Sequence, residues 1–283
     1  MIRNDRGDHF LLVTQHDHAA AAAALAGQLG NGRFDGPDPR PQVLLGTELH
    51  DAGWPMHDDP GGEADGPTLS PAGLPLDVLE VKPPLATNIW RESARRAAER
   101  DPYAGLLASL HVFTLSALAV SPTLTTNERF ERREELFLVN QFQQDEIERQ
   151  ESLRGRLGLR TDRPLHLGLA APNVDRDEDR LRFNFAWLRL CDAVSLDACA
   201  GRRLFDKSPV VHPRVGSTGM ELAMAHPEPD VVTLDPWPFA AGRVELAVPA
   251  RRVRREPFES VEAFRAAYAA AEPVTHRMTV RPG

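Results

Sequence analysis

The spacing of hydrophobic residues is helical over most of the chain and becomes strand-like only toward its C-terminal end. Apolar positions that recur every three or four residues predict a series of helices. These helices span Ala19–Leu29, Gln42 to about Ala52, Thr87 or Asn88 to Arg100, Tyr103–Val120, Asn127 to about Leu157, and Glu178–Ala200. Short β-branched runs predict strands at Val231–Leu234, Arg243–Val248 and Val274–Val280, with a helix at Val261–Ala271 before the last strand.

Several of these helix ends carry local signals. Thr14 and Asp17 have the spacing of a capping box, in which the threonine hydroxyl accepts a hydrogen bond from the first turn. Asp101 followed by Pro102 is the favoured order of a cap and a first helical residue. Gly53 and Gly201 follow predicted helices, where glycine commonly ends them. These signals make the helical assignments consistent with one another.

The pattern therefore predicts a mainly α protein with two parts. A helical body occupies residues 1–205, and a small α+β appendage at residues 206–283 packs on it. Within the body, Phe10–Val13 is a short strand or a buried lead-in to the first helix. Pro55–Pro84 is a long irregular stretch, of a length that usually indicates a functional or flexible loop. Pro164–Asp175 has an extended pattern.

Length, charge and cysteine content narrow the function classes. The chain has 283 residues, enough for one large domain or two small ones, and a formal net charge of -8. This acidic balance argues against a nucleic-acid polymer as partner. No apolar run approaches the roughly 18 residues of a membrane span, and the first residues have no apolar signal core, so we expect a cytoplasmic protein without membrane contact. Cys191 and Cys199 lie on one predicted helix, about 12 Å apart, which excludes a disulfide between them.

The candidate chemistry comes from histidine and aspartate at apolar positions. His18 lies on the apolar face of the first predicted helix, His50 and Asp51 close the second, and Asp192 is surrounded by leucine and valine on the last long helix. A buried carboxylate needs a cation, a hydrogen-bond donor or a proton, because an unpaired charge costs several kcal/mol to bury. Imidazole nitrogen and carboxylate oxygen together suit zinc, iron or manganese.

Each residue taken alone also has an ordinary explanation. A histidine at a helix start is commonly a capping or surface residue, and Asp192 alone is explained by a pair with Arg189. A His-Asp doublet arises by chance in many chains, and His57-Asp58-Asp59 is a near duplicate. The order along the chain, a histidine, then a His-Asp doublet, then a distant aspartate, favours a common site.

This order resembles the HD-domain superfamily of metal-dependent phosphohydrolases, whose members hold a metal in a helical bundle. The resemblance implies an HD-domain-like helical bundle and one divalent transition metal (Mn, Fe, Zn or Ni), with His18, His50, Asp51 and Asp192 as its ligands. The two-metal members carry two further histidines, of which this chain has only one comparable residue, His111, so the resemblance implies one metal. Short segments are also similar to an uncharacterised bacterial branch, a domain family of unknown function. These segments are Thr14–Ala19, His50–Trp54, Ser109–His111, Cys191–Leu196 and Asp235–Phe239.

The resemblance implies a phosphohydrolase that acts on a small phosphoester or nucleotide through a metal-activated water. Asp51 and Glu48 are the candidate catalytic groups. Other residues are predicted to contact the substrate or the ligands: His111, Gln15, Arg189 and Trp54. The alternative is a non-catalytic metal- or ligand-binding module without turnover. A metal oxidase is a third hypothesis with less support. The charged helix at 127–157 is predicted to be a solvated face over a buried stripe or the surface of a homodimer.

Overall fold

A six-stranded mixed sheet forms one side of the molecule and takes strands from both ends of the chain. The computed structural model describes residues 1–59, 66–119, 132–162, 165, 176–205 and 207–283. In spatial order the strands are β1 (Ile2–Asp5), β2 (His9–Val13), β7 (Val244–Arg254), β8 (Pro273–Pro282), β6 (Val231–Asp235) and β5 (Ala223–Glu228). Neighbouring strands are antiparallel except for β8 and β6, which are parallel. A separate pair, β3 (Val210–Val211) and β4 (Met220–Glu221), lies beside the sheet.

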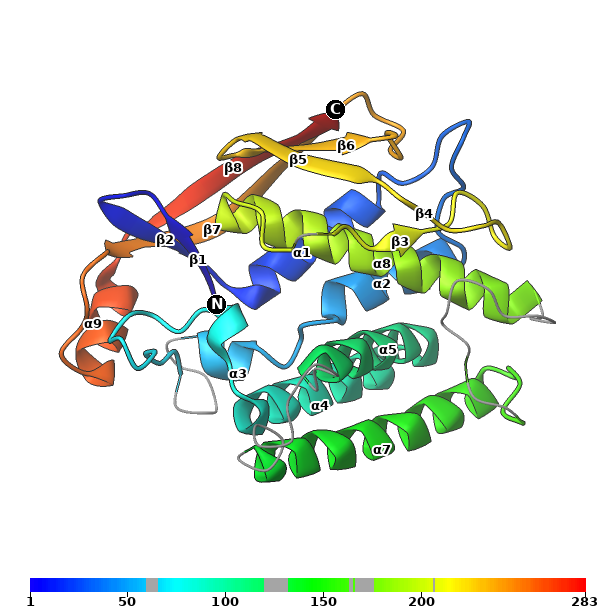
Figure 1. Cartoon of the computed structure of the whole chain (residues 1–283), viewed down its shortest axis with the longest axis horizontal. Helices are drawn as coiled ribbons and strands as arrows, with labels where there is room; N and C mark the ends of the chain where they lie inside the picture. Colours follow the sequence, from blue (N-terminus) through cyan, green and yellow to red (C-terminus); the bar gives the residue numbers. More distant parts are fainter. Residues whose placement is uncertain (60–65, 120–131, 163–164, 166–175, 206) are drawn as a thin grey trace.

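The helices form two layers beneath this sheet (Figure 1). Helices α1 and α8 lie against it, α2 follows, and α4, α5 and α7 form the far side. Helix α9 covers the other end of the sheet. The bounds are α1 (Gln15–Ala26), α2 (Arg40–Leu49), α3 (Pro55–Asp58), the 3-10 turn η1 (Val78–Glu80), α4 (Pro83–Arg100), α5 (Pro102–Ala119), α7 (Arg133–Arg156), α8 (Arg176–Ala200) and α9 (Val261–Ala270).

Local capping explains where several helices begin and end. The Thr14 hydroxyl accepts a hydrogen bond from the backbone N–H of Asp17, as the capping box predicts. The Asp101 carboxylate accepts hydrogen bonds from the first two free N–H groups of α5. Gly201 ends α8 with φ = 64°, in the left-handed region that favours glycine. Helix α4 begins earlier than predicted, because Pro83 and the proline after it occupy first-turn positions that need no N–H donor.

The two faces of strand β2 contact different cores, as the period of two in a strand requires. Leu11 and Val13 belong to the large core between the sheet and helices α1 and α8. Phe10 and Leu12 belong to a smaller core under α9. A third cluster joins α2, α5, α7 and α8. Helix α8 is therefore buried on nearly all sides and connects the sheet with the lower helices.

The expectation of a mainly α, HD-like helical bundle with a small C-terminal appendage is wrong. The chain has an α+β fold, because the sheet is large, extends from β1 at one edge to β5 at the other and provides the surface on which α1 and α8 pack. Sequence patterning missed β1 and β5, where apolar residues are few, and left β2 undecided between a strand and a lead-in. Strands from both sides of the predicted boundary at residue 205 share the sheet, and the division into two domains stays a prediction.

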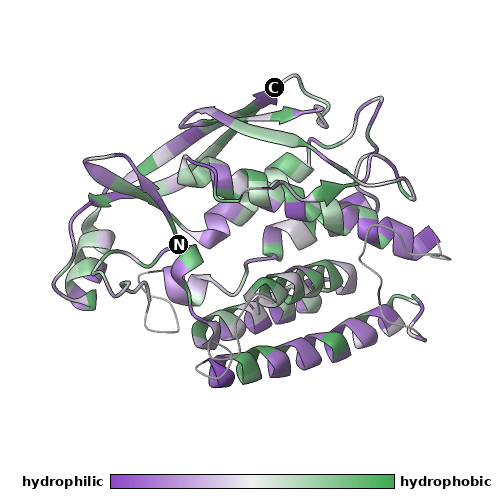
Figure 2. Cartoon of the chain, in the orientation of Figure 1, coloured by the Kyte–Doolittle hydropathy of each residue, from purple (hydrophilic) through white to green (hydrophobic). Residues whose placement is uncertain are grey.

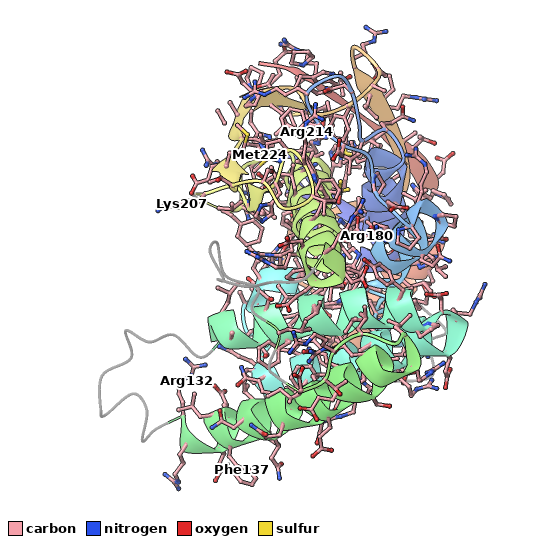
Figure 3. All side chains as sticks on the ribbon, turned by 90° about the vertical axis from the view of Figure 1, so that its right-hand side faces the viewer. Arg132, Phe137, Arg180, Lys207, Arg214 and Met224 are labelled. Atoms are coloured by element: carbon pink, nitrogen blue, oxygen red, sulfur yellow. The ribbon has the colours of Figure 1, made fainter. Side chains whose placement is uncertain are left out.

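Helix α7 buries Val139, Phe142 and Leu153 and leaves other apolar residues exposed. Hydrophilic and hydrophobic residues alternate along it in Figure 2, while α5 is apolar over most of its surface. Phe137 on α7 is 61% exposed and points away from the other helices (Figure 3). The homodimer surface predicted for this helix stays a prediction. Residues 127–131 at its predicted start, and almost all of 164–175, lie outside the described residues.

The structure bears on the expectations for the two cysteines and for membrane-spanning helices. Cys191 and Cys199 are both free and buried on α8. Across the described residues, no helix combines the length and the apolar character that crossing a membrane requires.

Candidate metal centre

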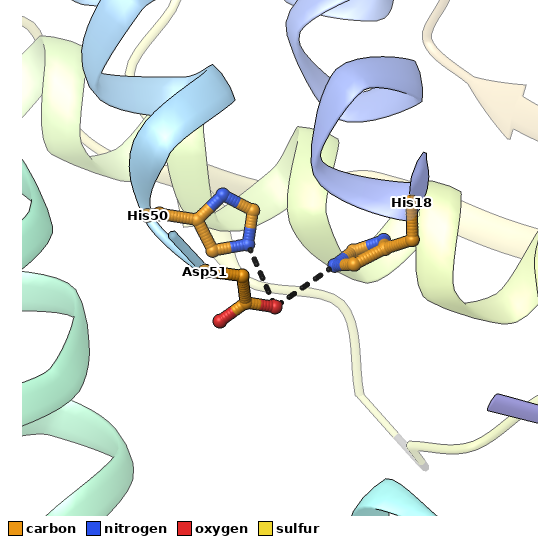
Figure 4. A group of neighbouring side chains, drawn as sticks. All are labelled: His18, His50 and Asp51. Atoms are coloured by element: carbon orange, nitrogen blue, oxygen red, sulfur yellow. Dashed lines mark ion pairs between the residues drawn. The ribbon is translucent and has the colours of Figure 1, made fainter. Parts of the chain in front are cut away.

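Four side chains from two helices and one turn meet in the interior between the two helical layers. The Nε2 atom of His18, on α1, lies 3.2 Å from Asp192 Oδ1 and 3.5 Å from Asp51 Oδ2. The Nε2 atom of His50 lies 3.3 Å and 3.6 Å from the same two oxygens. Figure 4 shows both imidazole rings directed at one oxygen of Asp51. The four residues predicted as ligands are therefore brought together.

The end of α2 explains how two consecutive residues reach one point. Helix α2 ends at Leu49, and the chain continues through a tight turn over residues 50–54. Gly53 packs this turn against α4, since a Cβ atom there would lie 2.1 Å from the carbonyl oxygen of Ile89. Its N–H donates to the hydroxyl of Ser93. The close approach to α4 thus holds His50 and Asp51 in place, and this is a stronger reason for glycine than the helix stop expected from the sequence.

Hydrogen bonds on the far side of each ring determine which imidazole nitrogen faces the centre. The Nδ1 atom of His50 lies 2.6 Å from the carbonyl oxygen of Thr47, which can only accept, so Nδ1 carries a proton. The Ser195 hydroxyl donates to the carbonyl of Asp192 and lies 2.7 Å from Nδ1 of His18, so it accepts from that nitrogen. Both Nε2 atoms consequently present a lone pair to the centre whenever the imidazoles are neutral.

These Nε2 atoms are buried and form no hydrogen bond with any described residue. A lone pair that faces a carboxylate oxygen at this distance is repelled unless a cation lies between them. Ligand atoms bound about 2.0–2.2 Å from a four- or six-coordinate ion are separated by roughly 2.9–3.5 Å, close to the distances above. His18, His50 and Asp51 also meet the geometric requirement of a metal-binding group. The donor set therefore fits a divalent transition metal.

Without a metal, protons supply the missing positive charge. Burial lowers the pKa of His50, but the carboxylates of Asp51 and Asp192 outweigh it and raise that pKa to about 9. The pKa of His18 is raised for the same reason. Burial works in the opposite direction on the two aspartates, yet the neighbouring imidazoles hold the pKa of Asp51 below its ordinary value and that of Asp192 well below it. One divalent ion would replace two protons at unchanged net charge.

His111 on α5 is a fifth polar group beside the centre. Its Nε2 lies 3.9 Å from Asp192 Oδ2, and its ring packs edge-on against His50 with centroids 4.8 Å apart. His50, His111 and Asp192 form a second group with metal-binding geometry. Burial lowers the pKa of His111 to about 4, so this imidazole is neutral at neutral pH.

A cleft of about 550 Å³ connects this centre with the surface. It lies between α5, α8 and the segment that leads through β3. Among the clustered side chains, Asp192 and His111 line it. Arg189, one turn before Asp192 on α8, also lines it and has its guanidinium 5.9 Å from the Phe185 ring centroid. Within the described part of the chain, Arg189 has no ion-pair partner.

The remaining predicted site residues lie at different distances from the centre and the cleft. Gln15 lies one turn before His18, and its side-chain nitrogen is buried without a hydrogen-bond partner among the described residues. Trp54 is buried, but it lines a small separate cavity beside Asp58 and not the cleft. Glu48 is exposed on α2. Two residues correspond to about 200° around a helix, so Glu48 points away from the side on which His50 is buried, and we do not carry its catalytic role further.

Sequence reasoning missed Ser195, Lys207 and His212. Ser195 orients His18, and only its position one turn after Asp192 could have suggested a role. Lys207 and His212 line the cleft although they lie beyond the predicted helical body. Nothing local marks them, because α8 and the segment after it form the cleft only in the folded chain.

Comparison with known proteins gives one family. The model of a family described as protein of unknown function (DUF3891) matches residues 1–255. No curated protein and no solved structure matches the chain. The family agrees with the uncharacterised branch expected from the sequence, and no match links the chain to the HD-domain superfamily.

Proposed function

We propose that this chain, which belongs to the DUF3891 family, is a metal-dependent hydrolase of small phosphoesters. One observation carries the proposal: two imidazoles, each with Nδ1 tied to a protein acceptor, direct Nε2 at the same two buried carboxylate oxygens. Such fixed tautomers are typical of histidines that bind metals.

The order of these residues along the chain supports the reaction class. A histidine, a His-Asp doublet and a distant aspartate are the pattern of the HD-domain phosphohydrolases. Only the ligand set and its chemistry are compared, since the helical-bundle part of that resemblance does not apply to this fold. The chemistry of a site, and not its scaffold, determines the reaction it supports.

The clustered residues would have different roles in metal binding and in the reaction. His18, His50, Asp51 and Asp192 would hold a divalent metal, which would supply Lewis-acid activation of water and of a phosphoryl oxygen. Asp192 lines the cleft, and Asp51 is not among the lining residues. Asp192 is thus the carboxylate in position to accept a hydrogen bond from water that enters and to orient it, whereas the sequence pointed to Asp51 as the catalytic carboxylate.

The substrate phosphate needs a cation that is not already paired. Arg189 meets this condition within the described residues, and it shares the cleft with Asp192 and His111. His111 is neutral and therefore acts as a hydrogen-bonding group toward the substrate or toward Asp192, without adding charge. Together these residues bind the phosphate next to the metal ligands.

The alternative is a module that binds metal or ligand without turnover. Structural metal sites are closed, whereas catalytic sites keep access for water and substrate. The cleft that reaches Asp192 therefore favours turnover.

Metal analysis is the first test. Protein purified without chelator, and protein supplied with Mn²⁺, Fe²⁺, Zn²⁺ or Ni²⁺, should retain about one ion per chain, measured by elemental mass spectrometry after gel filtration. The His50→Ala variant should lose it, and the His16→Ala variant should retain it, because His16 is exposed on the same helix as His18. Absence of a stoichiometric ion under all these conditions refutes the metal centre.

Activity is the second test. Metal-loaded protein should release phosphate from members of a panel of phosphomonoesters and phosphodiesters, and the Asp192→Asn variant should not. Retention of metal without hydrolysis of any member would favour the binding module. Oxygen uptake that depends on iron would instead indicate the oxidase alternative.

A further inference from the structure

Two chemically different kinds of side chain line the cleft beside Asp192. One kind is cationic: Arg189 on α8 and Lys207 in the segment that follows it. Lys207 extends from the side of the molecule between the sheet and the α4–α5 layer (Figure 3). The other kind is apolar and comes from α5, α8 and the α8–β3 segment: Leu115, Leu118, Phe185 and Phe205.

Among these apolar lining residues, Leu118 gives the clearest sign of contact with a ligand. It lines the cleft and is nevertheless 66% exposed, more than any other large hydrophobic side chain that the structure describes. Exposed apolar surface that is continuous with a polar cleft is typical of ligand-binding sites, where a bound molecule covers it.

The charge of the lining limits how anionic the ligand can be. Among the described lining residues, Arg189 and Lys207 are the cations without an ion-pair partner, whereas Arg182 pairs with Asp179. Asp192 and Glu221 bring negative charge to the same cleft. This balance suits a single phosphate group with one or two charges and disfavours a polyphosphate, whose charges would lack partners.

We propose that the ligand of this cleft is a phosphate monoester with an apolar or aromatic organic group. Its phosphate lies between Arg189 and the metal that Asp192 would help to hold, and its organic group covers Leu118 and the adjoining apolar side chains. The volume of about 550 Å³ lies within the range of small-molecule pockets. The placement of the phosphate rests on the proposed function, while the apolar contact rests on the cleft alone.

Two phosphonates that cannot be hydrolysed as esters test this inference. Phenylphosphonate and methylphosphonate carry the same anionic group and differ in the organic part. Isothermal titration of the metal-loaded protein should show that phenylphosphonate binds about tenfold more tightly or better, as expected when an aromatic ring is removed from water. The Leu118→Ala variant should reduce this ratio several-fold without weakening methylphosphonate. Arg189→Gln should weaken both about tenfold.

Leu79→Ala is the matched control, because Leu79 is 51% exposed and lies outside the cleft lining. It should leave the ratio unchanged, and both leucines are exposed enough for their variants to fold. Equal affinity for the two phosphonates overturns the inference, as does a ratio that Leu118→Ala leaves intact or an absence of binding. Preference for phenylphosphonate in a protein that holds no metal would support the apolar contact while refuting the proposed function.

Discussion

Raising the pH should destabilise the metal-free protein and leave the metal-loaded protein unaffected. In the metal-free state, the carboxylates beside His50 raise its pKa from 6.5 to about 9. A group whose pKa is higher in the folded state contributes stability that is fully present below its unfolded pKa. This stability is lost as the pH rises toward the folded pKa, because the folded chain must then release a proton that it binds tightly.

The expected size follows from this pKa difference. Between pH 6.5 and about pH 8.5, His50 alone should account for about 2 kcal/mol of lost unfolding free energy. His18 acts in the same direction, since its pKa is also raised. At roughly 2–4 °C per kcal/mol, the melting temperature should fall by roughly 4–8 °C. The pH range of the experiment ends at about pH 8.5, because the thiols of unfolded cysteines have a pKa of about 8.5 and their ionisation would add to the loss of stability at higher pH.

Thermal unfolding of chelator-treated protein, followed by circular dichroism at several pH values, measures this loss. Adding the metal should abolish the decline, because a metal ligand must be a neutral imidazole and no proton is then released. His50→Ala should flatten the decline in the metal-free protein, and His16→Ala should not. A melting temperature of the metal-free protein that stays constant or rises across this range would refute the electrostatic account of the centre.

Three further substitutions test other parts of the argument. Ser195→Ala should weaken metal affinity about 10–100-fold in competition with a chelating dye, whereas Ser116→Ala, which removes another buried helix hydroxyl, should not; equal effects would refute the orienting role. Gly53→Ala should destabilise the fold by about 3 kcal/mol, because the added Cβ meets the backbone of α4. The control Gly155→Ala has open space around the new Cβ and should stabilise α7 by roughly 0.5–1 kcal/mol. Denaturant titration measures both changes. Glu48→Gln should leave metal content and phosphoester hydrolysis unchanged, so a large loss of either would return this residue to the site.

The errors of sequence reasoning concentrate in the sheet. Strand β2 pairs with β7, some 240 residues away in the chain, and neither strand alone indicates its partner. The alternation that identifies β7 is clear, with every second residue buried along most of its length. In β1 and β5 most residues are polar or small, so their strand character depends on the neighbours that they hydrogen-bond.

The amino-acid sequence by itself determined the main helices and the four residues that now form the candidate centre. Helices are specified by contacts three or four residues apart and by caps such as Thr14 and Asp101, so a linear pattern contains them. Histidine and aspartate at apolar positions are also visible locally, because burying them is costly. Only the tertiary structure decided that Ser195 orients His18, that Glu48 faces solvent and that a cleft reaches Asp192. Each of these depends on the direction of a side chain relative to a distant segment. The packing of α8 between the sheet and the lower helices sets these directions.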